Sequence, residues 1–149
     1  MIDGVIITPL SQTFDERGKV MHMLREDSPV FTRFGEIYFS CTNPGAIKAW
    51  HRHKSMTLNY AVVYGVIKFV LFDNRPESKT RGCIQELFLS PENYCLVTVP
   101  PLIWNGFKGL GQKASIVANC SNYPHDPDEI ERKPALDDSI PYDWNIKHK

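Results

Sequence analysis

The sequence has no excess of positive charge. Its 149 residues include 17 Lys and Arg and 17 Asp and Glu, so the formal net charge is zero. Binding to nucleic acid through phosphates needs a basic face, so we expect no nucleic-acid partner. Long apolar runs are missing too, since every apolar stretch falls far short of the roughly 20 residues that span a bilayer. The opening segment MIDGVIITPL shows neither a basic start nor a cleavage site, which argues against a secretory signal. We therefore expect a cytoplasmic protein with no membrane partner.

Paired cysteine motifs are also absent. None of the four cysteines lies in a Cys-x-x-Cys pair, so a structural zinc site is not expected. Cysteines of a cytoplasmic protein stay reduced, and these four behave as small apolar side chains. A chain of this length buries enough apolar surface to fold without a disulfide or a metal. The sequence predicts one domain over residues 1–149.

No window of the sequence has a helical period of useful length. Instead, short segments rich in β-branched and aromatic residues alternate with turn residues, which is typical of an all-β sandwich, barrel or jelly roll. Residues 66–72 are almost wholly apolar, so we expect both faces of this strand to be covered, in a closed barrel or at a subunit interface. From Tyr123 the chain turns polar and rich in proline, which predicts a tail that wraps the barrel without adding a strand. We expect nine strands, over residues 5–8, 19–24, 36–41, 46–53, 58–63, 66–72, 84–89, 94–99 and 114–120.

Two histidines lie one residue apart in a predicted strand, at His51 and His53. Residues two apart on a strand share a face, so both imidazoles point the same way. Ile47 and Ala49 share that face in a regular strand, while Lys48 faces inward only if a bulge re-aims it. Histidines of this kind are either hydrogen-bonded structural residues or an acid–base pair. Their place in a barrel-lining strand favours the acid–base pair.

The spacing of Gly45, His51, His53 and Gly65 resembles the first sequence motif of the cupin superfamily, and residues 100–107 resemble the second. Metal-binding cupins use three His and one Glu. Leu58 stands at the position of the Glu, and Asn105 at that of the third His. Leucine cannot bind a metal, and an asparagine amide is a poor ligand beside imidazole. The resemblance thus implies a cupin jelly-roll barrel whose histidines act as acid or base, with no metal and no other cofactor.

The chain is similar over residues 13–144 to the 3,5-epimerases that act on dTDP-4-keto-6-deoxyglucose. The matching segments are Asp15 to Gly18, Lys48 to His51, Gly65 to Arg75, Asn119 to Tyr123 and Asp137 to Trp144. This resemblance implies that Arg17 contacts the diphosphate of a nucleoside-diphosphate sugar and that His51 is the catalytic base. It also implies a homodimer formed by exchange of N-terminal strands.

A ketone at C4 of the sugar acidifies the neighbouring C–H bonds, so a neutral imidazole can remove a proton there. The enolate oxygen then needs a cation, which we expect to be Lys48, and the resemblance implies that Asp137 orients the imidazole. We expect four further residues to bind the substrate, namely Glu36, Tyr38, Tyr60 and Asn105.

Two departures from the epimerases leave alternatives open. Leu58 replaces the catalytic Lys of the family, and Ala118 replaces the Tyr that acts as general acid. Another donor is then needed, with Tyr38, Tyr60, Tyr64 and His53 as candidates. The segment from Lys48 to Lys54 also resembles cupin 3,4-ketoisomerases, in which two histidines move protons on one face of the sugar. A third possibility is a cupin that binds a sugar nucleotide without turning it over.

Overall fold

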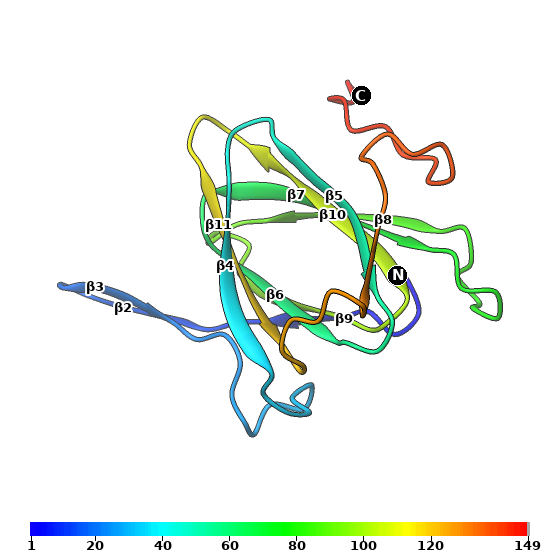
Figure 1. Cartoon of the computed structure of the whole chain (residues 1–149). Helices are drawn as coiled ribbons and strands as arrows, with labels where there is room; N and C mark the ends of the chain where they lie inside the picture. Colours follow the sequence, from blue (N-terminus) through cyan, green and yellow to red (C-terminus); the bar gives the residue numbers. More distant parts are fainter. Residues whose placement is uncertain (149) are drawn as a thin grey trace.

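Two antiparallel sheets face each other in the computed structural model, which describes residues 1–148 (Figure 1). The first, called the β4 sheet, has the order β1 (Ile6–Pro9), β9 (Cys95–Val99), β6 (Leu58–Tyr64), β11 (Ser115–Ser121) and β4 (Glu36–Thr42). The second, called the β5 sheet, has the order β12 (Ile130–Arg132), β5 (Ile47–His53), β10 (Ile103–Leu110), β7 (Val66–Asp73) and β8 (Ile84–Leu89). A hairpin of β2 (Gln12–Asp15) and β3 (Gly18–Met21) completes the fold. The all-β jelly roll is confirmed, and no helix in residues 1–148 is long and apolar enough to cross a membrane.

Apolar side chains from both sheets fill the space between them. In β7, Ile67, Phe69 and Leu71 point into this core, where they meet side chains of β6, β9 and β10. The alternate residues Val70 and Phe72 point outward into a second cluster. The expectation that this strand is covered on both faces is therefore confirmed.

The C-terminal segment provides the outer cover of the β5 sheet. Trp144 packs on Trp50 with ring centroids 5.0 Å apart, and the indole N–H of each donates to Ala135 O. Lys68, the one basic side chain of β7, is buried beneath this segment and lies 5.3 Å from the ring of Tyr142. Cation–π contact offsets part of the cost of burying this ammonium group. The cover of β7 is thus the tail of the same chain.

Three strands were not expected from the sequence. β2 belongs to an exposed hairpin, and β10 contains Gly106 and Gly109, which weaken a strand pattern. Gly106 is required by close approach, because a Cβ at this position would lie 2.4 Å from Cβ of Ala49 in β5. The prediction that the tail adds no strand is wrong, since β12 pairs with β5. Pairing with a distant strand supplies hydrogen bonds that local sequence cannot reveal.

A bulge in β5 changes which of its residues face the inside. Asn105 of β10 pairs with His51 and Phe107 pairs with Lys48, so Ala49 and Trp50 together stand opposite Gly106. Ile47, Ala49 and Trp50 therefore pack in the outer cluster, contrary to the regular alternation expected for Ile47 and Ala49. Lys48 is turned inward, to the same side as His51.

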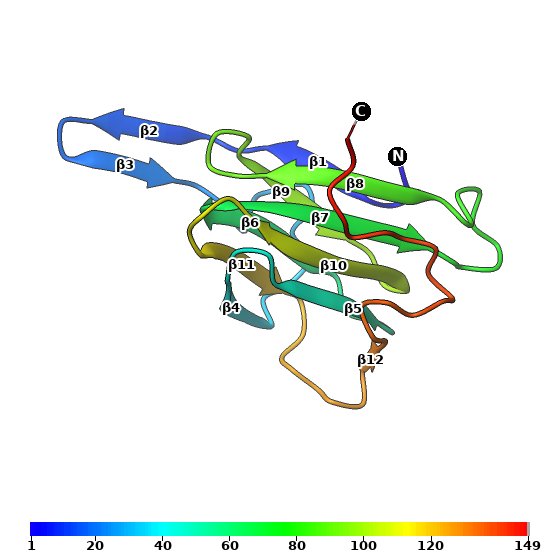
Figure 2. The ribbon, with the colours of Figure 1, turned by 90° about the horizontal axis from the view of Figure 1, so that it is seen from above.

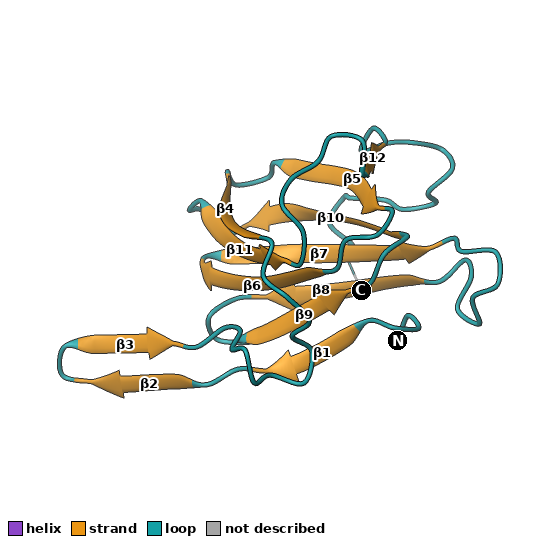
Figure 3. Cartoon of the chain, turned by 60° about the horizontal axis from the view of Figure 1, so that its bottom comes forward, coloured by secondary structure: helices purple, strands orange, loops and turns teal. Residues whose placement is uncertain are grey.

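The hairpin of β2 and β3 extends away from the two sheets (Figure 2, Figure 3). It exposes two apolar side chains, Phe14 at 69% and Val20 at 59% of their surface. Arg17 lies at its turn, paired with Asp15, and its side chain is 90% exposed. Within one chain, Arg17 is thus outside the space between the sheets.

Candidate active site

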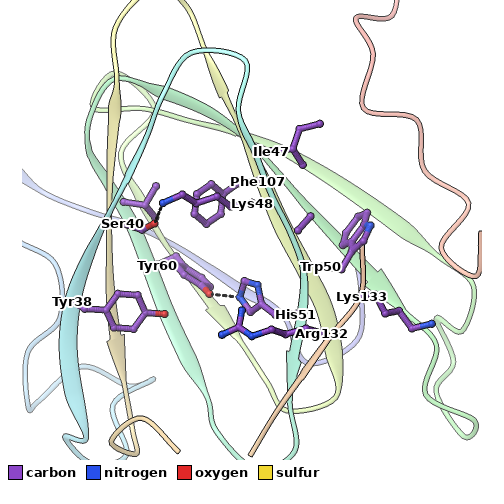
Figure 4. Close-up of a pocket in the computed structure, with 12 residues that line it drawn as sticks. Tyr38, Ser40, Ile47, Lys48, Trp50, His51, Tyr60, Phe107, Arg132 and Lys133 are labelled. Atoms are coloured by element: carbon purple, nitrogen blue, oxygen red, sulfur yellow. Dashed lines mark hydrogen bonds between the residues drawn. The ribbon is translucent and has the colours of Figure 1, made fainter. Parts of the chain in front are cut away.

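The two sheets enclose a cavity beside β4, β5 and β12. It consists of two adjoining hollows of about 390 Å³ each, which share Tyr38, His51 and Arg132 in their walls. The first hollow is lined by the polar Lys48 and Tyr60 and by the apolar Phe107 and Val117. Glu36 and His53 line the second. Figure 4 shows side chains of β4 and of β5 approaching one another across the first hollow.

His51 is held by a buried chain of hydrogen bonds. Asn105 Nδ2 donates to the carbonyl oxygens of His51 and Ile103, both at 3.2 Å, which fixes the orientation of its amide. Asn105 Oδ1 is then an acceptor, and the Tyr60 hydroxyl donates to it at 3.3 Å. Since that hydroxyl has a single proton, the 3.1 Å bond between Tyr60 and His51 must be donated by Nε2–H of His51. The lone pair of His51 is therefore on Nδ1.

The surroundings of His51 keep its ring neutral. Burial is the largest cause, followed by the nearby His53 and Arg132, and together they lower the pKa of His51 to about 3. Burial, and then the neighbouring Tyr38, raise the pKa of Tyr60 well above its usual value. At neutral pH the site thus holds a neutral imidazole next to an uncharged phenol.

His53 points into the same cavity but has a different partner. Its Nδ1 hydrogen-bonds to Glu129 Oε2, while Glu129 Oε1 accepts the N–H groups of Ser55 at 2.5 Å and Met56 at 2.8 Å. Burial alone would raise the pKa of Glu129, but the bonds from Ser55, His53 and Met56 outweigh it and lower that pKa. Glu129 is therefore a carboxylate at neutral pH.

Tyr38 stands on the opposite wall, in β4. Asn119 Oδ1 accepts the N–H of Asn59 at 3.1 Å, so the Asn119 amide is oriented, and its Nδ2 donates to the Tyr38 hydroxyl at 2.8 Å. With its oxygen accepting from Asn119, the Tyr38 hydroxyl keeps its proton free to donate. Tyr38 is 41% exposed and its hydroxyl points toward His51 (Figure 4).

Two cationic side chains in the cavity wall come from β5 and β12. Lys48 Nζ donates to Ser40 Oγ at 2.8 Å and to Cys41 O at 2.6 Å, which spans the cavity from β5 to β4. Arg132 stands opposite His51 in the pairing of β12 with β5. Its guanidinium has no hydrogen-bond or ion-pair partner within residues 1–148, so it is available to an anion.

The structure brings together most of the residues predicted for the site. Glu36, Tyr38, Lys48, His51, His53 and Tyr60 line the cavity. Asn105 is fully buried and supports Tyr60 and His51 from behind. Arg17 lies on the projecting hairpin, and Asp137 Oδ1 accepts from the Lys133 ammonium and the Ser139 N–H. In the described part of the chain, no hydrogen bond joins Asp137 to either histidine.

Sequence reasoning missed Glu129 and Arg132. Both lie in the segment taken for a wrapping tail, and only the pairing of β12 with β5 brings them to the histidines. Glu129 and Glu131 flank Ile130, and this polar–apolar–polar alternation is a faint strand signal. As for metal, residues 1–148 contain no group of three or more His, Cys, Asp or Glu placed to hold an ion.

Comparisons with known proteins place this geometry in context. The sequence model of the dTDP-4-dehydrorhamnose 3,5-epimerase family matches residues 1–149. The fold is similar to a crystal structure of a dTDP sugar isomerase from Desulfovibrio desulfuricans, with a TM-score of 0.94, 44% identity and coverage of 96% of this chain and 92% of that one.

Two curated proteins are similar over nearly their full length. One is the probable low-salt glycan biosynthesis epimerase Agl13 of Haloferax volcanii, 35% identical, with 98% of this chain and 96% of that protein covered. The other is the spore coat polysaccharide biosynthesis protein SpsL of Bacillus subtilis, 29% identical, with all of both chains covered.

Proposed function

The chain belongs to the dTDP-4-dehydrorhamnose 3,5-epimerase family, and from this premise we propose that it epimerises a 4-keto-6-deoxy sugar carried on a nucleoside diphosphate. The family and its relatives indicate a nucleotide-sugar epimerase that serves polysaccharide or glycan synthesis. One observation carries the assignment of roles. His51 on β5 and Tyr38 on β4 face each other across one cavity, so a sugar between them has a proton acceptor on one face and a donor on the other.

In the first step, His51 removes a proton from the carbon beside the ketone. The C–H bond breaks, the proton goes to Nδ1 of the neutral imidazole, and the electron pair moves onto the C4 oxygen as an enolate. The bond from Nε2–H to Tyr60 persists and spreads the charge of the imidazolium. General-base catalysis of this kind typically contributes about 100- to 10,000-fold to a rate.

The enolate oxygen needs positive charge nearby. Lys48 was predicted for this role, and its inward turn at the bulge supports the assignment. Arg132 adds a second cation beside His51, with its guanidinium unpaired in residues 1–148. We assign the enolate oxygen to the space that these two side chains share with the imidazole.

In the second step, Tyr38 returns a proton to the opposite face of the carbon. The enolate electron pair forms the new C–H bond and the carbonyl is restored. The His51 imidazolium releases its proton to water and the Tyr38 phenolate takes one from water, to which Tyr38 is exposed, so both residues return to their starting states. The configuration is thereby inverted. This role replaces the donor that the family has at the position of Ala118, on the strand next to β4.

We also propose that the protein is a homodimer in which the hairpin of each protomer reaches the partner. The exposed Phe14 and Val20 give the hairpin an apolar surface to bury. Ile37 and Phe39 are exposed on the outer face of β4 and add a second apolar surface. Arg17 would then meet the diphosphate in the cavity of the partner. This part of the proposal rests on the distance of the hairpin from its own cavity (Figure 1).

Proton NMR of dTDP-4-keto-6-deoxyglucose in deuterated buffer tests the function. Deuterium entering at C3 or C5 together with an inverted product supports the epimerase. Migration of the keto group would instead show a 3,4-ketoisomerase, a reaction that the shared cavity of His51 and His53 also allows. Binding without any exchange would reduce the protein to a sugar-nucleotide receptor.

A further inference from the structure

The two histidines of the cavity have separate hydrogen-bond networks. His53 meets Glu129, which lies just before β12, whereas His51 meets Tyr60. Their ring centroids are 6.0 Å apart and the ring planes are nearly perpendicular, at 85°. Neither network passes through the other, so each ring is oriented independently.

The partners impose opposite tautomers on the two rings. A carboxylate only accepts hydrogen bonds, so Nδ1 of His53 must be protonated, and in the neutral ring the lone pair lies on Nε2. In His51 the chain through Tyr60 and Asn105 places the proton on Nε2 and the lone pair on Nδ1. Nε2 of His53 has no hydrogen-bond partner within residues 1–148 and His53 lines the second hollow.

Glu129 is well fixed for an orienting role. Its side chain is only 14% exposed, and its other oxygen is held by two backbone N–H groups of the loop after β5. Glu131, two residues further along the chain, pairs with Arg52 and not with a histidine. The Arg52 guanidinium stacks over Trp104, so this pair lies on the outer face of the sheet, away from the cavity. The chain therefore offers a neighbouring carboxylate that is also paired with a side chain of β5 but does not line the cavity.

We propose that Glu129 is a positioning residue that makes His53 a second proton acceptor of the cavity, in the opposite tautomer to His51. This inference rests on the proposed function for the identity of the substrate, but its structural half does not. A second acceptor ring, whose centroid lies 6.0 Å from that of His51, gives the site a base for a second carbon beside the same ketone.

Imidazole NMR of the wild-type protein, with isotope-labelled histidine, tests the structural half without substrate. We expect His53 to be protonated at Nδ1 and His51 at Nε2, the five histidines being assigned by single substitutions. Nε2 protonation of neutral His53 would overturn the proposal. The spectrum does not depend on turnover. If the protein exchanges no sugar proton, the proposed function is contradicted, and the tautomer of His53 is still decided by the spectrum.

Substitution tests the catalytic half. In Glu129→Gln we expect kcat for deuterium exchange at one of the two carbons to fall at least tenfold, while KM stays within twofold of the wild-type value. Glu129→Asp, which keeps the carboxylate, should restore part of the rate. Glu131→Gln, the matched control, should leave exchange at both carbons within twofold. Equal rates in Glu129→Gln and wild type, or an equal loss in Glu131→Gln, would overturn the role of Glu129.

Discussion

His51 donates its Nε2–H to the hydroxyl of Tyr60 across 3.1 Å, and this bond depends on a buried amide behind it. Asn105 accepts from Tyr60 and donates to two carbonyl oxygens, so its polar atoms are all engaged. The arrangement commits one nitrogen of His51 to the protein and leaves the other for chemistry. It also occupies the asparagine that stands where a metal-binding cupin has a histidine.

The first prediction follows from this arrangement and concerns metal. We expect the purified protein to hold no stoichiometric transition metal, because Leu58 and Asn105 provide no ligand where metal-binding cupins have Glu and His. Elemental analysis of protein purified without chelators measures this. About one zinc, iron or manganese per chain, lost in His51→Asn, would contradict the prediction.

The second prediction separates proton removal from inversion. In Tyr38→Phe we expect the inverted product to form about 100-fold more slowly or worse, because the opposite face has lost its donor. Deuterium should still enter the sugar, since His51 can return the proton to the face from which it came. NMR reports both quantities in one experiment. Tyr64→Phe, on an exposed tyrosine at the end of β6, is the control and should behave as wild type.

Undiminished product formation in Tyr38→Phe would remove Tyr38 from the mechanism. Loss of both deuterium entry and product would assign it to substrate binding instead.

Much of the fold could be predicted from the sequence, because β-branched and aromatic segments between turn residues predict strands locally. The shared face of His51 and His53 follows from the same two-residue period. The bulge that turns Lys48 inward and the pairing of β12 with β5 could not be predicted in this way. Both arise from contacts between distant segments, such as the 76 residues that separate His53 from Glu129. The projecting position of Arg17 likewise depends on tertiary structure.

The third prediction concerns Arg132. In Arg132→Gln we expect kcat to fall by about 100-fold, the lower end of the loss on removing one donor to an oxyanion. Affinity for the nucleoside diphosphate alone should stay within twofold, because the diphosphate is assigned to Arg17. Steady-state kinetics and calorimetry measure the two effects, with Arg81→Gln in an exposed loop as the control. A loss of nucleotide affinity with unchanged kcat would place Arg132 at the phosphates.

The fourth prediction concerns the dimer. We expect Arg17→Ala to lower nucleotide affinity tenfold or more, which is about 1.4 kcal/mol. If Arg17 acts on the partner, mixing Arg17→Ala with His51→Asn should restore activity, because exchange of protomers creates one cavity with both native residues. Calorimetry measures the affinity, and an activity assay after refolding the mixture measures the rescue. A mixture no more active than its components would contradict action across the dimer.

The role of His51 as the base is the central claim, and solvent-deuterium exchange into the sugar by His51→Asn tests it most directly. Asparagine keeps a donor near Tyr60 but has no basic nitrogen, so the cavity should stay intact while proton removal fails. We expect exchange at the affected carbon to fall by about 100- to 10,000-fold, with nucleotide affinity largely unchanged. Exchange at a near-normal rate in His51→Asn would contradict the mechanism.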